Sequence, residues 1–149
     1  MAEKAAWDFY YLLPEEERFD LVTICPSYVF GPSLIPGGFA VSGIIEKFFD
    51  GSLTEVSTER LTIVDVRDVS RMHLDAIRKP EIKNERFIAS SGHLFKKEIA
   101  DIFAAEFGPK GFKVPTQEKE GERERSARIS GDKAKAVFGE FYSPKDAVI

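Results

Sequence analysis

The feature that most constrains the fold is a short apolar run rich in β-branched residues, Leu21–Cys25, which Pro26 ends. Such a run predicts a strand buried on both faces, as is typical of a parallel sheet. Proline cannot donate to a ladder, so the strand is expected to stop there. Ligands of open α/β sheets bind just past the carboxyl ends of strands, so the loop Pro26–Pro32 is the first place to expect a site. An ordinary strand and turn is the alternative.

Composition narrows the class of protein. A chain of 149 residues can form one domain with a real core. Its net charge of -4 gives no general attraction to nucleic acid or to anionic membranes. No apolar run approaches the roughly 18 residues that span a bilayer, and the first residues lack the shape of a secretory signal. The single cysteine, Cys25, excludes an internal disulfide and indicates a reducing, cytoplasmic compartment.

Hydrophobic spacing predicts the other elements. We expect helices over Ala2–Leu13, Val41–Phe49, Asp65–Ile77, Ile99–Phe107 and Ser130–Val137, strands over Leu61–Val64 and Glu85–Ser90, and loops over Ser33–Phe39 and Gln117–Arg128. Met1 lies inside the first helical pattern with no N-cap residue before it, and Ser143–Pro144 would start a helix barely one turn from the end. Both ends therefore suggest a chain cut from something longer, with a frayed first helix as the alternative.

Few side chains suggest chemistry. Asp65 and Asp68 resemble a capping box with acidic residues at both ends, and capping requires fewer assumptions than an acid/base pair. His73 falls on the apolar face with Val69, Met72, Ala76 and Ile77, so a packed or partly exposed histidine is expected. His93 is expected in a turn, without a metal site. The sequence contains no nucleophile elbow, Walker loop or G-x-G-x-x-G. Spacing alone gives no self-sufficient active site.

Four blocks in order carry a resemblance: AEKAAW (Ala2–Trp7), CPSYVFGP (Cys25–Pro32), IVDVRDVSRMHL (Ile63–Leu74) and RFIASSG (Arg86–Gly92). Together they resemble the C-terminal half of an extended short-chain dehydrogenase/reductase, in the dihydroflavonol reductase and methylglyoxal-type aldehyde reductase branch of the NAD-dependent epimerase/dehydratases. The resemblance covers nearly the whole chain and is weakest over Lys113–Arg128.

The resemblance implies an α/β fold: a partial NAD(P)-binding Rossmann fold of late strands and helices, with the small substrate-binding lobe. Residues 1–149 would form a single partial domain. Segments 1–32 and 61–92 would be the late Rossmann elements, and segments 33–60 and 110–149 would belong to the substrate lobe.

The family pattern also implies part of a site for NADP or NAD. By its match to P-x-x-V-x-G-P, Pro26 would begin the loop against the nicotinamide, and Val29 would contact the carboxamide through its backbone. Ser42 resembles a position that reaches the cofactor in the aldehyde reductases. Tyr28 and the loop Ser33–Phe39 would border the substrate pocket. A strand-ending proline, a core valine and a helix-capping serine are the simpler alternatives.

No catalytic residue can be assigned. In the family, the helix containing AEKAAW follows the catalytic Tyr-x-x-x-Lys, and this sequence begins just past the position of that lysine. Tyr10, Tyr11 and Tyr28 match none of the family's catalytic positions.

Two hypotheses about function remain. In the first, the chain is a portion of an NAD(P)-dependent reductase that acts on a small aldehyde, ketone or flavonoid-like carbonyl, and it is inactive alone. In the second, it is a non-catalytic binding or structural subunit. Because the strand Leu21–Cys25 would lack parallel neighbours, we also expect self-association or a protein partner that completes the sheet.

Overall fold

The computed structural model describes residues 1–34, 41–121 and 129–149. The helices are α1 (Ala2–Leu12), α2 (Ser42–Glu46), α3 (Val66–Arg78), α4 (Lys96–Phe107), α5 (Asp132–Phe138) and α6 (Pro144–Val148), with 3₁₀ turns η1 (Glu15–Glu17) and η2 (Gly108–Lys110). The strands are β1 (Val22–Pro26), β2 (Tyr28–Phe30), β3 (Arg60–Asp65), β4 (Glu85–Ala89) and β5 (Gly92–Phe95). No helix in these ranges is long and apolar enough to cross a membrane.

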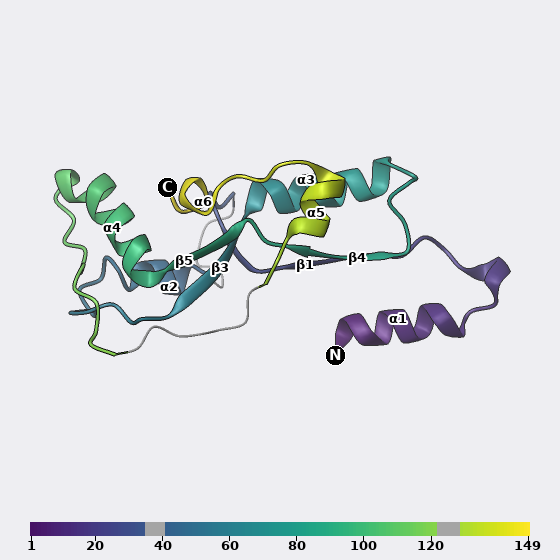
Figure 1. Cartoon of the computed structure of the whole chain (residues 1–149), viewed down its shortest axis with the longest axis horizontal. Helices are drawn as coiled ribbons and strands as arrows, with labels where there is room; N and C mark the ends of the chain where they lie inside the picture. The colour runs from purple at the N-terminus through teal and green to yellow at the C-terminus, as the bar shows by residue number, and fades with distance from the viewer. Residues whose placement is uncertain (35–40, 122–128) are drawn as a thin grey trace.

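The predicted strand over Leu21–Cys25 is β1, and it pairs in parallel with β4, from Val22 opposite Glu85 to Pro26 opposite Ala89. Its two faces are covered by different elements. The side chain of Ile24 packs toward α3, whereas Thr23 accepts a hydrogen bond from Trp7 Nε1 of α1 at 3.3 Å. The β1–β4 sheet thus lies between α1 on one side and α3 with α5 on the other (Figure 1). The expectation of full burial was wrong: residues 22–25 are half-buried, because β4 is the only strand beside β1 in the described ranges.

A second sheet has the order β2-β3-β5, with β2 parallel and β5 antiparallel to β3. It corrects two expectations. The segment Pro26–Pro32 is not all loop, because Tyr28–Phe30 pairs with β3. His93 lies in β5 opposite Thr62 rather than in a turn. The strand pairing decides both cases, and short strands of this kind have no periodicity that a sequence could display.

Two apolar cores follow from the two sheets. One, between β3, α2, α4 and α6, contains Phe30, Val41, Phe48, Val56, Leu61, Ile63, Ile99, Ala100, Phe103, Ala147 and Val148. The other, between β4, α3 and α5, contains Val64, Met72, Ile82, Phe87, Ala89, Ala134 and Phe138. Each includes an edge-to-face aromatic pair: Phe48 with Phe103 at 5.5 Å and Phe87 with Phe138 at 5.0 Å between ring centroids.

Most helix predictions are confirmed in place, with shifted ends. α1 ends before Pro14, as expected. α2 spans five residues, shorter than the predicted Val41–Phe49. Ser143 caps α6 by accepting a hydrogen bond from Asp146 N. Residues 35–39 of the expected loop Ser33–Phe39, and residues 122–128 of the expected loop Gln117–Arg128, lie outside the described residues.

The apolar face predicted for α3 is only partly correct. Val69, Met72 and Ala76 pack into the core, whereas His73 and Ile77 are exposed, Ile77 to 84%. The ring Nδ1 of His73 lies 2.8 Å from the carbonyl oxygen of Val69, one turn earlier. The sheet covers a narrower stripe of the helix than 3.6-residue spacing allows, so the flanking positions face outward.

Gly131 allows α5 to approach the end of β4. A Cβ placed on Gly131 would lie 2.0 Å from the backbone carbonyl oxygen of Ser90. We therefore expect Gly131→Ala to lower the free energy of unfolding by about 2–3 kcal/mol, as overpacking does. Urea unfolding followed by circular dichroism measures the change. Gly43→Ala in α2, where nothing lies within 4 Å of the new Cβ, is the matched control and should be neutral or slightly stabilising. Equal effects would contradict the close approach.

Candidate functional site

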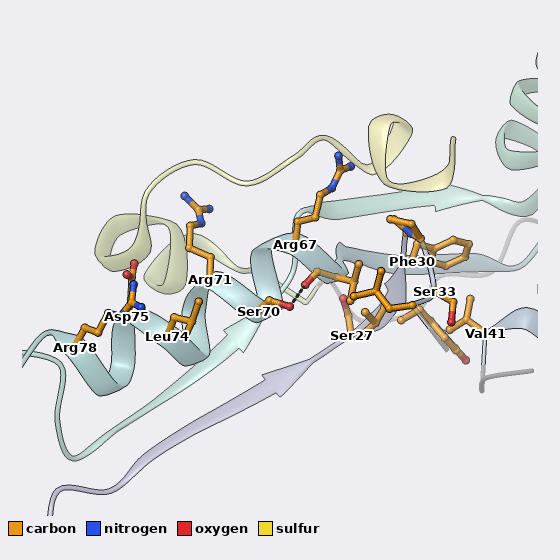
Figure 2. A pocket seen from close by; sticks show the side chains of 16 residues that line it. Ser27, Phe30, Ser33, Val41, Arg67, Ser70, Arg71, Leu74, Asp75 and Arg78 are labelled. Atoms are coloured by element: carbon orange, nitrogen blue, oxygen red, sulfur yellow. Dashed lines mark hydrogen bonds between the residues drawn. The ribbon is translucent and has the colours of Figure 1, made fainter. Parts of the chain in front are cut away.

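The main cavity, of about 1040 Å³, opens past the carboxyl ends of β1 and β2. One wall is the segment 27–34 together with Val41, and the other is the outer face of α3 from Val66 to Arg78 (Figure 2). The parallel pairing of β2 with β3 sets this geometry, because both strands end at the same edge and α3 starts immediately after β3. The cavity therefore lies where ligands of α/β sheets bind.

The four predicted site residues divide into two pairs. Tyr28 and Val29 line the cavity, Tyr28 with 43% of its surface exposed and Val29 half-buried. Pro26 is the exposed last residue of β1 and precedes the lining residue Ser27. Ser42 is the first residue of α2 and follows the lining residue Val41. Two candidates thus face the cavity directly, and two sit one residue away from it.

The wall formed by α3 was not suspected from the sequence. Ser70, Leu74 and Arg78 repeat every four residues along the helix and line the cavity. Leu74 is 49% exposed, so its side chain is accessible from the cavity. An (i, i+4) series beside the core face could have indicated a second lined surface, but only the fold shows that the segment 27–34 lies opposite.

The cavity is mainly apolar between the strands, with a few hydroxyl groups, and its α3 wall also carries the charged side chains of Arg67, Arg71, Asp75 and Arg78. Val29, Val41 and Val66 contribute aliphatic surface. The hydroxyl of Ser27 donates to Ala89 O at 3.1 Å, and that of Ser70 donates to Val66 O at 2.8 Å. Among the described residues, no three His, Cys, Asp or Glu side chains are grouped so as to hold a metal ion. Such a surface suits a flat organic ring that carries a small number of polar groups.

Asp65 fixes the start of α3 and hence one wall of the cavity. Its buried carboxylate accepts from the Arg67 backbone N–H at 2.7 Å and from Arg67 Nε and Nη2 at 2.8 and 2.6 Å. Burial opposes ionisation of Asp65, but the hydrogen bonds from Arg67 outweigh it and hold the pKa of this carboxyl below its ordinary value. The guanidinium carbon of Arg67 lies 3.8 Å from the ring centroid of Tyr142.

Asp68 ties α3 to the C-terminal segment. Its buried carboxylate accepts from Arg71 Nη2 and from the Tyr142 backbone N–H, both at 2.8 Å, and Arg71 Nη2 also donates to Glu140 O at 2.6 Å. Burial raises the pKa of Asp68 despite these partners. The capping-box prediction is therefore half right: Asp65 caps the helix, whereas Asp68 binds a distant segment. We call Asp65, Arg67, Asp68, Arg71 and Tyr142 the C-terminal clasp.

A second cavity, of about 690 Å³, lies beyond the segment Phe30–Pro32. Its wall includes Tyr142 and Val148, and it shares Arg67 and Phe30–Pro32 with the main cavity. Gly31, with φ of +118°, lets this dividing segment rest on α3, because a Cβ there would lie 2.9 Å from Val66 Cγ1. The clasp thus supports the segment that separates the two cavities.

No protein-family model matches the chain. It is 35% identical over 114 residues to the ketoreductase azaE of Aspergillus niger, covering 70% of this chain and 32% of that protein. It is 31% identical over 112 residues to the NADPH-dependent methylglyoxal reductase GRE2 of Saccharomyces cerevisiae, covering 71% of this chain and 33% of that protein. The chain thus spans about a third of the length of these curated relatives.

Solved structures agree with the sequence matches. The crystal structure of Gre2 from Candida albicans superposes with a TM-score of 0.80 and 31% identity, covering 99% of this chain and 47% of that one. Its complex with NADPH gives a TM-score of 0.77. The fold is therefore that of the Rossmann-type NADPH reductases, of which this chain supplies a part. The resemblance stated from the four sequence blocks is confirmed, and the chain belongs with the extended short-chain dehydrogenase/reductases of the dihydroflavonol and methylglyoxal reductase branch.

The buried pair of Asp65 and Arg67 predicts a pH-dependent contribution to stability. A carboxyl whose pKa is lowered by folding stabilises the fold above its unfolded pKa, near 3.8, and loses this effect as pH falls through the folded pKa. We expect Asp65→Asn to lower the free energy of unfolding at pH 7 by about 2 kcal/mol, since Asn still caps the helix but cannot pair with Arg67. Urea unfolding at several pH values measures the difference from the wild type, which should shrink below about pH 4.

Asp75→Asn is the control for this prediction. Asp75 forms a surface pair with Lys79 at 3.0 Å on the same helix, and its loss should cost about 0.5 kcal/mol or less. An Asp65→Asn effect as small as that of Asp75→Asn, or one independent of pH, would contradict the role given to the buried pair.

Proposed function

We propose that this chain forms the nicotinamide and substrate side of an NADPH-dependent reductase of small carbonyl compounds. The main cavity past the carboxyl ends of β1 and β2 is the observation that carries the proposal. The relatives named above are ketone and methylglyoxal reductases, and one structural neighbour is crystallised with NADPH. We assign segments 1–32 and 61–92 to the Rossmann part and segments 33–60 and 110–149 to the substrate lobe. The one unpaired cysteine supports a cytoplasmic location.

The residues present fit one end of the cofactor. In this proposal, NADPH supplies the hydride, and the chain's own residues hold the ring and exclude water. The aliphatic surface of Val29 and Val66 provides a wall for the nicotinamide ring. By the family pattern, the backbone of Val29 would contact the carboxamide. Pro26, which needs no hydrogen-bond partner for its nitrogen, can end the strand beside the ring. Ser42, at the start of α2, would reach the cofactor, and Tyr28 would border the bound carbonyl compound.

The opposite end of a dinucleotide has no counterpart in this sequence. There is no glycine-rich loop at a strand–helix junction to hold a pyrophosphate, and no Tyr-x-x-x-Lys to donate a proton to the carbonyl oxygen. Proton donation and cofactor orientation both lower the barrier to carbonyl reduction. We therefore infer that the 149-residue chain by itself does not reduce a carbonyl.

A kinetic assay tests this inference. The purified chain, supplied with NADPH and methylglyoxal, should oxidise no NADPH above the rate of the buffer, as followed by absorbance. The protein must first be shown to be folded by circular dichroism. Turnover that scales with the concentration of the chain would refute the proposed inactivity.

Binding of half-cofactors tests the proposed site itself. Reduced nicotinamide riboside should shift the backbone amide resonances of residues 27–34, 66, 67 and 70, because these line the main cavity. Adenosine, the other half, should leave them unchanged. Tyr28→Ala should weaken the binding of methylglyoxal in the same experiment, whereas Tyr11→Ala on α1, also exposed, should not. Equal shifts with adenosine, or shifts with neither compound, would exclude the cavity as a nicotinamide site.

A non-catalytic binding subunit is the second candidate, and the free edge of β1 favours it. Ser27 N donates to Ala89 O and Glu85 N donates to Leu21 O, so the odd-numbered residues of this segment turn their backbone toward β4. Val22, Ile24 and Pro26 therefore direct theirs to the opposite edge, where no strand lies in the described ranges. An open edge of this kind recruits another strand. We propose that a protein partner or a second copy of the chain pairs there.

Self-association through this edge predicts a measurable change on substitution. The chain should elute from size-exclusion chromatography larger than a monomer and shift toward the monomer on dilution. Val22→Pro should favour the monomer, because it removes a donor from the free edge without touching the ladder to β4. Val22→Ala, which shortens the side chain but keeps the N–H, is the control. A wild-type monomer at all concentrations, or identical elution of the two variants, would contradict edge pairing.

A further inference from the structure

The short helix α2 borders three cavities. Val41, just before it, lines the main cavity, and Ile45 lines the second. Ile44 of α2, together with Lys47 and Phe48 just after the helix, lines a third cavity of about 180 Å³. This third cavity shares no lining residue with the other two, and the proposed reductase site does not use it.

Backbone hydrogen bonds build the frame of the third cavity. Val56 N donates to Gln117 O at 2.8 Å and Lys119 N donates to Val56 O at 2.9 Å, which joins the segment after α2 to a distant one. Lys96 N donates to Glu59 O at 3.0 Å at the start of α4. The floor is apolar and closed, since Phe48 and Val56 are 2% and 0% exposed. The polar side chains at the rim of the cavity are therefore attached to a backbone that these hydrogen bonds hold in place.

The polar groups of this cavity are mostly hydrogen-bond donors. Three lysines, Lys47, Lys96 and Lys119, line it with a single carboxylate, Glu55. The hydroxyl oxygen of Ser57 is buried and has no hydrogen-bond partner in the structure. A buried hydroxyl without a partner is costly, so an acceptor in the cavity would be stabilising.

One of the three lysines, Lys96, forms an ion pair with a carboxylate outside the cavity. Lys96 Nζ lies 2.5 Å from Glu59 Oε2, and its side chain is 24% exposed. Glu59 does not line the cavity. The pair therefore fixes the position of Lys96 at the rim, while part of its positive charge is compensated by Glu59.

We propose that this third cavity binds a small oxyanion, a phosphate or carboxylate group. The Ser57 hydroxyl donates to an oxygen of the anion, and Lys47, Lys96 and Lys119 supply the positive charge. The volume of about 180 Å³ limits the group to inorganic phosphate, a short carboxylate or the charged end of a longer ligand.

Titration of the whole chain with inorganic phosphate, followed by amide resonances at constant ionic strength set with chloride, tests the proposal. Phosphate should shift the resonances of residues 44–57, 96 and 119 and saturate. Lys96→Gln should weaken binding about tenfold, which corresponds to about 1.4 kcal/mol. Ser57→Ala should weaken it several-fold and leave the stability of the phosphate-free chain unchanged or higher, since it removes the unpartnered hydroxyl. Acetate as a second titrant distinguishes a carboxylate site from a phosphate site.

Glu59→Gln is the matched control, because it breaks the same ion pair from the other side. It leaves Lys96 in the cavity without its compensating carboxylate, so phosphate should bind as tightly as in the wild type or more tightly. Equal weakening by Lys96→Gln and Glu59→Gln would mean that the pair has only a structural role, and would overturn the proposal. The absence of saturable shifts with both phosphate and acetate would overturn it too.

Discussion

The buried carboxylate of Asp65 is the contact on which the arrangement of this chain depends. It ends β3, caps α3 and holds the guanidinium of Arg67 in place. A carboxylate removed from water is tolerated only with such compensation, so the three hydrogen bonds are a condition of the fold rather than an addition to it. Once Arg67 is fixed, Tyr142 can lie against it, and Asp68 one turn further on accepts the Tyr142 N–H. Local helix capping thereby becomes a long-range link between the middle and the end of the chain.

This link shapes the candidate site although none of its acids touches a ligand in the proposal. Arg67 and the segment Phe30–Pro32 form the common wall of the main and second cavities. Gly31 lies against the start of α3 with no room for a side chain between them, because a Cβ there would lie 2.9 Å from Val66 Cγ1. The position of Tyr142 therefore influences both cavities through Arg67.

The sequence predicted the elements that local patterns determine and the family that motif order indicates. Its predictions failed for features that depend on contacts between distant segments. Leu21–Cys25 reads as a strand in a parallel sheet because apolar β-branched runs ended by proline favour one, and Asp65 was recognisable as a cap. The family blocks directed attention to Tyr28 and Val29, which do line the main cavity. The sequence could not predict three features, because each depends on a neighbour remote in sequence. These are the cavity wall on the outer face of α3, the pairing of His93 in β5 and the contact of Tyr142 with the clasp. The domain boundaries, the cofactor roles of Pro26, Val29 and Ser42 and the substrate role of Tyr28 stay predictions.

The missing N–H of Pro26 bears on both functional proposals, the reductase site and strand pairing at the free edge of β1. In the parallel ladder its nitrogen faces the free edge of β1, so the missing N–H costs the β4 pairing nothing. A strand added to that edge could pair with Val22 and Ile24 but would find no donor at Pro26. Pairing would then stop before the segment 27–34, and the mouth of the main cavity would stay open. Completion of the sheet and binding of a ligand are therefore compatible, because the proline separates the surface that each requires.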